Sequence, residues 1–578
     1  MYSTICDPKI MKTLLPQDFP ADKLSKPEYK MVVEKNIKVT MRDGVKIDMD
    51  IYRPDAPGQF PVIFSSTGYM KETAHLPNIP VFHFAEVNDI EWFVSRGYIF
   101  AIQDQRGSGD SVEGIWDLYG EEMQNDLYDC IEWLGVQPWS TGKVGMMGES
   151  LLAWAQWFAA AKQPPHLVSI MPFDGGADLY RDVVYHGGTL SQAFPSTWHF
   201  IEIRGNYRLA QMHNHPNEQG QWDMQWDILK HPTFDDFWKI RRADMSKIKV
   251  PVYSIGVWHK TGLHLRGNTR GYEEIDAPKK LLLIHGDFEG DEMAIYNSPE
   301  LRMLLLRWLD HWLKGNDTGF MDEPPVTAFI HGLNEYRQEN EWPIERAEYT
   351  KLYLSPGKSG TVDSLNDGCL SFEEPASETG SVTYSYPNPD WSHFSGIGSA
   401  VMENGQTYSY KRVLTFTTEP FEEDLEVLGH ARLVVYVSTE QEYPAYKDTK
   451  IMLKVWDQLP DDQHDEGYPL KGRLLSHGRL RASHSFEHDE ELERPWRPYY
   501  THENPVEIEN GKIYKYEVEV YPFGNIFKKG HRLRLELANH DSGPFDFGGH
   551  MYGLNIGKDT IYFNKEYPSH LVLPVTNK

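Results

Sequence analysis

The chain has 578 residues, more than one hydrophobic core usually organises, so two or three domains are expected. Its 85 acidic and 57 basic residues give a net charge of −28, and such an acidic surface repels phosphate backbones and anionic lipids, which argues against nucleic-acid and membrane partners. No apolar run reaches the length of about 18 residues that a membrane-spanning helix needs. The three cysteines are scattered and predict neither a disulfide framework nor a zinc site, so we expect a cytoplasmic protein.

The N-terminal third has the pattern of a parallel α/β sheet. Residues 36–58 alternate between apolar and polar side chains, as β-strands do. Two short apolar runs, 60–68 and 98–107, end in glycine or polar residues and are typical of buried parallel strands. Residues 120–137 repeat apolar positions at helical spacing, and a further strand follows at 142–148. This order of strands and helices predicts an α/β sheet with crossover connections.

The middle of the chain interrupts this pattern and then resumes it. Residues 177–245 are rich in Trp, His and Phe and lack a strand pattern, so we expect a mostly helical insertion over the sheet. Strands resume at 249–258 and 279–286. A helix then begins at Ser298, which can cap its N-terminus, and ends at Gly315.

Beyond about residue 345 the helical signal fades. Successive stretches alternate with a period of two and are separated by clusters of Gly, Pro, Asn and Asp. This pattern predicts an all-β sandwich as the C-terminal domain.

The stretch VGMMGESLLAWAQWFAAA (144–161) places a serine between a strand and a long apolar helix. Gly148 and Ser150 fit the nucleophile elbow G-x-S-x-G, whereas Leu152 replaces its second glycine. A helix that starts here points its first N–H groups at any anion beside Ser150. The alternative is that Ser150 is a plain N-cap, a common role for serine at helix starts. Its position directly after a strand of a parallel sheet favours the nucleophile.

Several separated motifs resemble one known family. They are, in chain order, VTMRDGVKIDMDIYRP (39–54), STGYMK (66–71), DQRGSGDSVEGIW (104–116), WSTGKVGMMGES (139–150), LTFTTEPFEEDLEVLGHARL (414–433) and FKKGHRLRLELAN (527–539). Their order and spacing resemble the cocaine esterase-like hydrolases, a family that includes the X-prolyl dipeptidyl peptidases and the α-amino acid ester hydrolases. The resemblance covers nearly the whole chain, from about residue 30 to residue 570.

The resemblance implies a fold and a domain organisation. The parts are an α/β-hydrolase domain (30–176 and 246–345), a helical cap insertion (177–245) and a C-terminal jelly-roll β-sandwich (346–578).

The resemblance also implies a serine hydrolase of the esterase or acylase type, with a small-molecule ester or amide as substrate. Ser150 would attack the carbonyl and form an acyl-enzyme that water then hydrolyses. The N–H of Leu151 and the hydroxyl of Tyr69 would form the oxyanion hole. No cofactor or metal is expected, and a homo-oligomer is compatible with the sequence.

The catalytic base and acid depart from the family pattern. The family places its acid in a W-Y-D pattern, where this chain has Lys260, and its histidine in a G-P-W-x-H pattern, where this chain has Glu289. One interpretation makes His285 the base, because it directly follows a strand, with Glu289, Asp287 or Asp291 to orient it. A second makes His264 or His259 the base and Glu289 the acid, because a triad requires geometry and not a fixed chain order. A third is a broken triad.

These departures leave other functions open. One is an X-prolyl dipeptidyl peptidase, which needs an acidic anchor for a peptide amino terminus. Another is a non-hydrolytic relative that binds a ligand or uses Ser150 for acyl transfer or cyclisation. Aromatic and histidine side chains of the insertion predict an apolar pocket and an aromatic or bulky acyl group. They are Trp198, Trp222, Trp226, Trp238, His199, His213 and His215.

Overall fold

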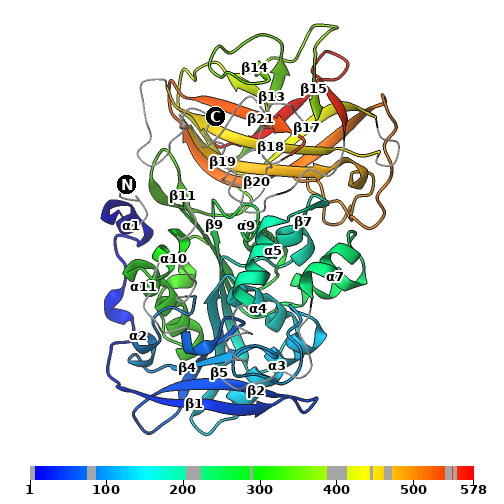
Figure 1. Ribbon diagram of the computed structural model, residues 1–578. Helices are drawn as coiled ribbons and strands as arrows, with labels where there is room; N and C mark the ends of the chain where they lie inside the picture. The colour runs from blue at the N-terminus through cyan, green and yellow to red at the C-terminus, as the bar shows by residue number, and fades with distance from the viewer. Residues whose placement is uncertain are drawn as a thin grey trace.

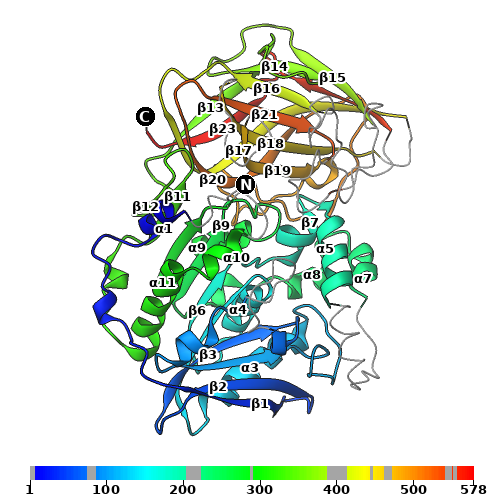
Figure 2. The same ribbon diagram turned by 60° about the vertical axis from the view of Figure 1, so that its left-hand side comes forward.

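The chain folds into two stacked parts, an α/β domain and a C-terminal β domain (Figure 1). The β domain follows the α/β domain in the chain and lies at its upper end in both views (Figures 1 and 2). The computed structural model describes residues 7–73, 86–203, 223–286, 291–386, 413–442, 447–460, 472–540, 550 and 556–577.

A ten-stranded sheet forms the centre of the α/β domain, with strand order β1-β2-β4-β3-β5-β6-β9-β10-β11-β12. The pairs from β4 through β11 are parallel, and the outer pairs are antiparallel. The strands are β1 (Met31–Thr40), β2 (Lys46–Pro54), β3 (Phe60–Thr67), β4 (Ile99–Asp104), β5 (Ser140–Glu149), β6 (Leu167–Phe173), β9 (Val252–Val257), β10 (Lys279–Ile284), β11 (Val326–Ile330) and β12 (Glu335–Glu339). The α/β sheet inferred from sequence is therefore confirmed.

Helices cover this sheet, and α3, α4 and α11 among them were predicted from the sequence. The apolar face of α3 consists of buried Met123, Leu127, Cys130, Ile131 and Leu134. The helices are α1 (Pro8–Leu14), α2 (Ile90–Val94), α3 (Glu121–Gly135), α4 (Leu151–Ala161), α9 (Leu265–Glu274), α10 (Asp291–Tyr296) and α11 (Pro299–Leu309).

The helix α11 has the predicted ends. The Leu301 N–H donates to the Ser298 hydroxyl at 3.2 Å, which caps the first turn. The helix runs on as a π-helical turn, Asp310–Lys314, and Gly315 ends it with φ +77°. The last turn is wider than the α-helix expected from sequence, while its end point is the predicted one.

The insertion contains helices and one short ribbon. Its elements are two π-helical turns (Leu179–Val184 and His199–Ile203), β7 (Tyr185–His186), β8 (Thr189–Leu190), α5 (Ala193–Trp198), α7 (Met224–Lys230) and α8 (Asp236–Ile240). Trp238 packs edge-on against Tyr180 and Tyr185, so it belongs to the core of the insertion. Trp226 is 59% exposed and faces solvent. The two-strand ribbon was not predicted.

The C-terminal strands form a closed ring of hydrogen-bonded pairs. Strand β17 pairs with β20 on one side and with β22 and β23 on the other, which closes the order β17-β20-β19-β18-β21-β16-β14-β13-β23. The strands are β13 (Glu348–Ser355), β14 (Asn366–Ser371), β15 (Ser381–Tyr386), β16 (Leu414–Thr418), β17 (Leu425–Gln441), β18 (Lys450–Gln458), β19 (Gly472–Arg481), β20 (Ile513–Phe527), β21 (Arg532–Ala538), β22 (Gly557–Tyr562) and β23 (His570–Val575).

The ring corrects the expected pair of open sheets. Strand β17 is long and carries a bulge between Gly429 and Ala431, where Gly429 has φ +135°. A bulge bends a strand and increases its twist, so β17 can pair with successive neighbours and close the barrel. The all-β character is confirmed, and the jelly-roll order stays a prediction.

Charged side chains link the two domains. Arg266 of α9 lies 3.2 Å from Glu519 of β20. Glu273, at the other end of α9, lies 2.8 Å from Arg497 and 2.6 Å from His430. The β domain therefore holds both ends of α9. In the described part of the chain, no helix has the length and apolar character needed to cross a membrane.

Gly107, in the loop after β4, is held in a conformation that leaves no room for a side chain. Its φ is +70°, and an added Cβ would lie 2.4 Å from the backbone nitrogen of Trp116. Gly315 has nearly the same φ, +77°, but an added Cβ there would meet nothing within 4 Å. Replacing each glycine by alanine therefore distinguishes the effect of backbone strain, present at both positions, from that of steric overlap, present only at Gly107.

We expect Gly107→Ala to lower the free energy of unfolding by about 1–3 kcal/mol more than Gly315→Ala, because both replacements carry the same left-handed strain and only Gly107→Ala adds a backbone clash. Urea unfolding followed by tryptophan fluorescence measures both variants. Equal midpoints would show that the loop after β4 can move aside at no cost.

Candidate active site

Ser150 lies on a sharp corner between β5 and α4. Its backbone has φ +57° and ψ −118°, a conformation that costs a residue other than glycine roughly 1–3 kcal/mol. Gly148, two residues earlier, has φ +146°, and an added Cβ would lie 2.5 Å from the Leu152 Cβ. The turn therefore requires Gly148 even though Leu152 replaces the second glycine of the sequence motif.

The corner geometry does not fit a plain helix cap. N-cap residues adopt β-region angles and accept a hydrogen bond from the first turn of the helix, whereas the Ser150 side chain makes no such bond. Its Oγ lies instead 3.4 Å from the Nε2 atom of His264. Strain at a position that presents a hydroxyl to an imidazole is typical of a functional site.

His264 is the histidine that the structure brings to Ser150. It is buried and precedes α9, which starts at Leu265. Its Nε2 also lies 3.8 Å from the Asp174 Oδ2. Asp174 directly follows β6 and has φ +55°. Asp174 was not predicted from the sequence, although an acid directly after a parallel strand was an available signal.

Trp154 of α4 contacts the other nitrogen of the His264 ring. Its indole N–H donates to Nδ1 at 3.0 Å. An indole nitrogen is only a donor, so Nδ1 must act as the acceptor in this bond. In this arrangement a neutral His264 carries its proton on Nε2, the nitrogen that faces Ser150 and Asp174.

His285 lies in a different environment. Its Nδ1 is 2.7 Å from the Tyr336 hydroxyl, and its ring packs against Phe329. The assignment of His285 as base stays a prediction. Asp287 and Glu289, two of its predicted partners, lie outside the described residues, and Asp291 is buried at the start of α10.

Tyr69 lies in the loop after β3 and contacts the insertion. The Trp198 indole N–H donates to the Tyr69 hydroxyl at 2.8 Å, so the phenol oxygen acts as an acceptor there. The Trp198 ring also lies 6.1 Å from Trp154 and 6.0 Å from Trp116, measured between ring centroids. Aromatic side chains thus connect the insertion, the Tyr69 loop and the helix that follows Ser150. Three further side chains of the predicted pocket lie outside the described residues: Trp222, His213 and His215.

Two family profiles match successive parts of the chain. The profile of the X-Pro dipeptidyl-peptidase (S15 family) matches residues 43–287, which contain Ser150 and His264. The profile of the X-Pro dipeptidyl-peptidase C-terminal non-catalytic domain matches residues 318–572. The chain therefore contains an S15-type domain followed by the C-terminal domain of the same peptidases.

Relatives and structural neighbours of the chain include esterases. Cocaine esterase from Rhodococcus sp. (strain MB1 Bresler) is 26% identical, over 94% of this chain and 99% of that protein. A CocE/NonD family hydrolase from Staphylococcus aureus has a TM-score of 0.77 at 27% identity, over 95% of this chain and 94% of that one. An α-amino acid ester hydrolase shares the fold, with a TM-score of 0.69 at 19% identity over 95% of this chain and 97% of that one. These comparisons confirm the resemblance to the cocaine esterase-like hydrolases.

The protein carries a buried group of charged side chains around Lys260, where the family pattern has its acid. The Lys260 ammonium lies 3.0 Å from the Oε1 of Glu292 on α10, and His259 Nε2 lies 3.3 Å from the Oε2 of the same carboxylate. Burial alone would raise the pKa of the Glu292 carboxyl. The charges and hydrogen bonds of Lys260 and His259 outweigh burial and hold that pKa below its usual range. The positive charge of Lys260 therefore balances the carboxylate of Glu292, which belongs to α10.

Glu149, directly before Ser150, is a second unusual carboxyl. Burial and the charges of Glu292, Glu86 and Asp174 raise its pKa well above the usual range, which favours its neutral form. In that form Glu149 adds no negative charge to oppose an oxyanion at Ser150.

The loop that carries Tyr69 is fixed by a buried lysine, Lys71. Its side chain is fully buried, and its ammonium lies within 2.7 to 3.7 Å of five carboxylates: Asp110, Asp48, Glu72, Asp50 and Asp104. Burial alone would lower the pKa of Lys71, but the charges of these carboxylates raise it above its ordinary value. We call this group the Lys71 cage.

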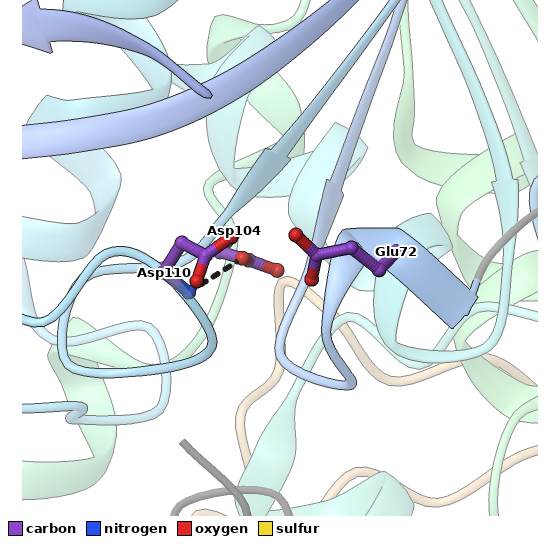
Figure 3. A group of neighbouring side chains, drawn as sticks. All are labelled: Glu72, Asp104 and Asp110. Carbon is purple, nitrogen blue, oxygen red and sulfur yellow. Dashed lines mark hydrogen bonds between the residues drawn. The ribbon is translucent and has the colours of Figure 1, made fainter. Parts of the chain in front are cut away.

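Asp104 connects two loops of the Lys71 cage. One of its oxygens accepts from the Lys71 backbone N–H at 2.6 Å and the other from the Asp110 backbone N–H at 2.8 Å. Figure 3 shows Glu72 facing Asp104 and Asp110 from the opposite loop. Oxygens of these three carboxylates lie within 4.8 Å of one another, as in a metal site, but the Lys71 ammonium already supplies a positive charge there. Burial raises the pKa of the Asp104 carboxyl to about 7.

We expect Lys71→Met to lower the free energy of unfolding by about 3–5 kcal/mol, because it leaves buried carboxylates without their shared cation. Lys38→Met is the matched control: its ammonium lies 2.5 Å from Asp48 of the same cage but is about half exposed, and such pairs contribute about 1 kcal/mol or less. Thermal unfolding of both variants measures the difference. Similar losses in the two variants would contradict a central role for Lys71.

Proposed function

We propose that this protein is a serine hydrolase that cleaves a carboxylic ester or amide of a small molecule through an acyl-enzyme on Ser150. The observation that carries this proposal is the strained corner that presents the Ser150 hydroxyl 3.4 Å from His264. Contacts of this kind are often long in the absence of substrate and tighten on binding.

In the proposed reaction the Ser150 Oγ attacks the substrate carbonyl carbon while its proton passes to His264 Nε2. The carbonyl oxygen becomes an oxyanion that accepts hydrogen bonds from the Leu151 N–H and the Tyr69 hydroxyl. The Leu151 N–H is the first of α4 and has no acceptor within the helix, and each such donor is worth about 3 kcal/mol. His264 then returns the proton to the leaving group, and water hydrolyses the acyl-enzyme by the same steps.

His264 must change its protonation for this role. A base that accepts at Nε2 carries its proton on Nδ1, and that proton would meet the Trp154 indole N–H. The proposed reaction therefore includes loss of the Trp154–His264 hydrogen bond when substrate binds. Asp174, 3.8 Å from Nε2, would then stabilise the imidazolium that forms.

The surroundings of Ser150 favour an apolar acyl group. Trp154 lies on the helix that follows Ser150, and Trp198 joins it to Tyr69 through ring contacts and a hydrogen bond. Small-molecule pockets are mostly apolar with a few polar groups that orient the ligand. We therefore propose an aromatic or bulky acyl group as the preferred substrate part.

A non-hydrolytic reaction is the second candidate, and one observation favours it. With the Nδ1 atom of His264 accepting from Trp154, the neutral ring is a donor toward Ser150 rather than a base. In that form the site would bind a carbonyl ligand, or transfer an acyl group from an activated donor that needs no strong base.

The deciding experiment is to treat the wild type and Ser150→Ala with a fluorophosphonate probe and with p-nitrophenyl benzoate, p-nitrophenyl acetate and alanyl-prolyl p-nitroanilide. We expect labelling of the wild type only, faster turnover of the benzoate than of the acetate, and a loss of about four to six orders of magnitude in kcat for Ser150→Ala. The anilide measures peptidase activity in the same assay. Equal labelling and rates in both proteins would exclude Ser150 as the nucleophile, and an unreactive wild type would favour the non-hydrolytic candidate.

We expect His264→Ala to lower kcat on the best ester by about four orders of magnitude, because Ser150 then lacks its base. His285→Ala is the matched control, since it also removes a buried histidine but one that contacts Tyr336, and it is expected to stay within about tenfold of the wild type. The reverse pattern would assign the base to His285.

A further inference from the structure

A cavity lies at the opposite end of the sheet from Ser150. It has a volume of about 480 Å³ and is lined by the starts of β3 and β5, the segment before β1, the turn before β4 and the end of the helix that follows α11. Lys143 of this cavity lies near the start of β5, and Ser150 follows the end of that strand, about 23 Å away along an extended chain. The cavity is therefore separate from the candidate active site.

The charge of this cavity is opposite to that of the whole chain. Four cations line it, Lys26, Arg96, Lys143 and Lys314, against a single carboxylate, Glu28. The chain as a whole carries 28 more acidic than basic residues. A cluster of cations in a strongly acidic protein concentrates positive potential at one place on its surface.

Within the residues that the structure describes, no carboxylate oxygen lies within 4.0 Å of Lys26, Arg96 or Lys143. Burial, followed by the charge of nearby Arg302, lowers the pKa of Arg96. Burial also lowers the pKa of Lys314, whose carboxylate neighbour Asp310 is 3.7 Å away.

Hydrogen bonds and a ring contact also hold Arg96 and Lys314 in place. The Arg96 guanidinium lies 3.7 Å from the centre of the Trp92 ring, and its Nη1 donates to the Trp92 carbonyl at 2.9 Å. The Lys314 ammonium donates to the Ser25 hydroxyl at 2.7 Å and to the Arg96 carbonyl at 2.6 Å. Cations that are already ordered lose little entropy when a ligand binds.

One wall of the cavity is aromatic. The rings of Tyr29 and Phe60 meet edge to face at 5.2 Å. An added Cβ at Gly97 would lie 3.2 Å from Tyr29, 3.6 Å from Phe60 and 3.6 Å from the Lys314 nitrogen, so an aromatic surface and a cation converge at this glycine. The cavity therefore joins an apolar wall to a cluster of cations, in a volume that fits a small molecule.

We propose that this cavity binds a small molecule that carries a phosphate group and an apolar ring, with the phosphate at Arg96, Lys143 and Lys314 and the ring against Tyr29 and Phe60. Arginine and lysine pair with phosphate through charge-assisted hydrogen bonds. The dianion would compensate the charges of these cations. This inference does not depend on the reaction at Ser150.

The test is isothermal titration calorimetry of the full chain with phenyl phosphate, inorganic phosphate and phenol. We expect saturable binding of phenyl phosphate, at least about tenfold weaker binding of inorganic phosphate and none of phenol, because charge and ring contribute together. Phenyl phosphate is not a carboxylic ester, so the proposed hydrolase reaction does not consume it.

Variants locate the binding site. Lys143→Gln and Arg96→Gln are expected to weaken phenyl phosphate binding at least about fivefold, and Lys529→Gln, an exposed lysine of the β domain, is expected to leave it unchanged. Lys143 is exposed, so its replacement keeps the test valid if Arg96→Gln disturbs folding. The proposal is overturned if phenyl phosphate shows no saturable heat, or if it binds equally to the wild type and to Lys143→Gln.

Discussion

The strained turn at Ser150 is the constraint around which the candidate site is built. A left-handed serine between a central strand and a buried helix persists only where its surroundings hold it. Gly148 lets the strand end come close to Leu152, and α4 is buried along its length between the sheet and the insertion. The hydroxyl is therefore presented at the carboxyl edge of the sheet, where the loops after the neighbouring strands also end. His264 and Asp174 reach it from two such loops.

Two further arrangements fix the partners of this turn. The Lys71 cage holds the loop of Tyr69 through a single buried ammonium among carboxylates, which leaves the loop few alternative positions. On the other side, α9 carries His264 at its start and is bound by ion pairs at both ends to the β domain. The geometry around Ser150 thus depends on contacts made well away from it.

Sequence periodicity predicted most of the central strands, the helices α3, α4 and α11 and the corner at Ser150, because these features follow from the local spacing of apolar residues, glycine and caps. The partners of Ser150 were harder to predict. His264 was one of three histidine candidates, and only the fold shows that it lies beside the hydroxyl. Asp174 and Trp154 were missed because their roles arise from contacts between distant segments. The closed barrel was missed for a similar reason, since strand pairing across the ring leaves no mark on alternation within a strand.

The ion pairs at α9 have a consequence for how this protein would lose function under stress. Arg266, two residues after His264, is shared between Asp182 of the insertion and Glu519 of the barrel. Separation of the domains would remove Glu519 and admit water to a buried guanidinium while the ten-stranded sheet stays intact. The position of His264 would then be lost while the core of the sheet stays folded, so the candidate site depends on this interface as well as on the sheet.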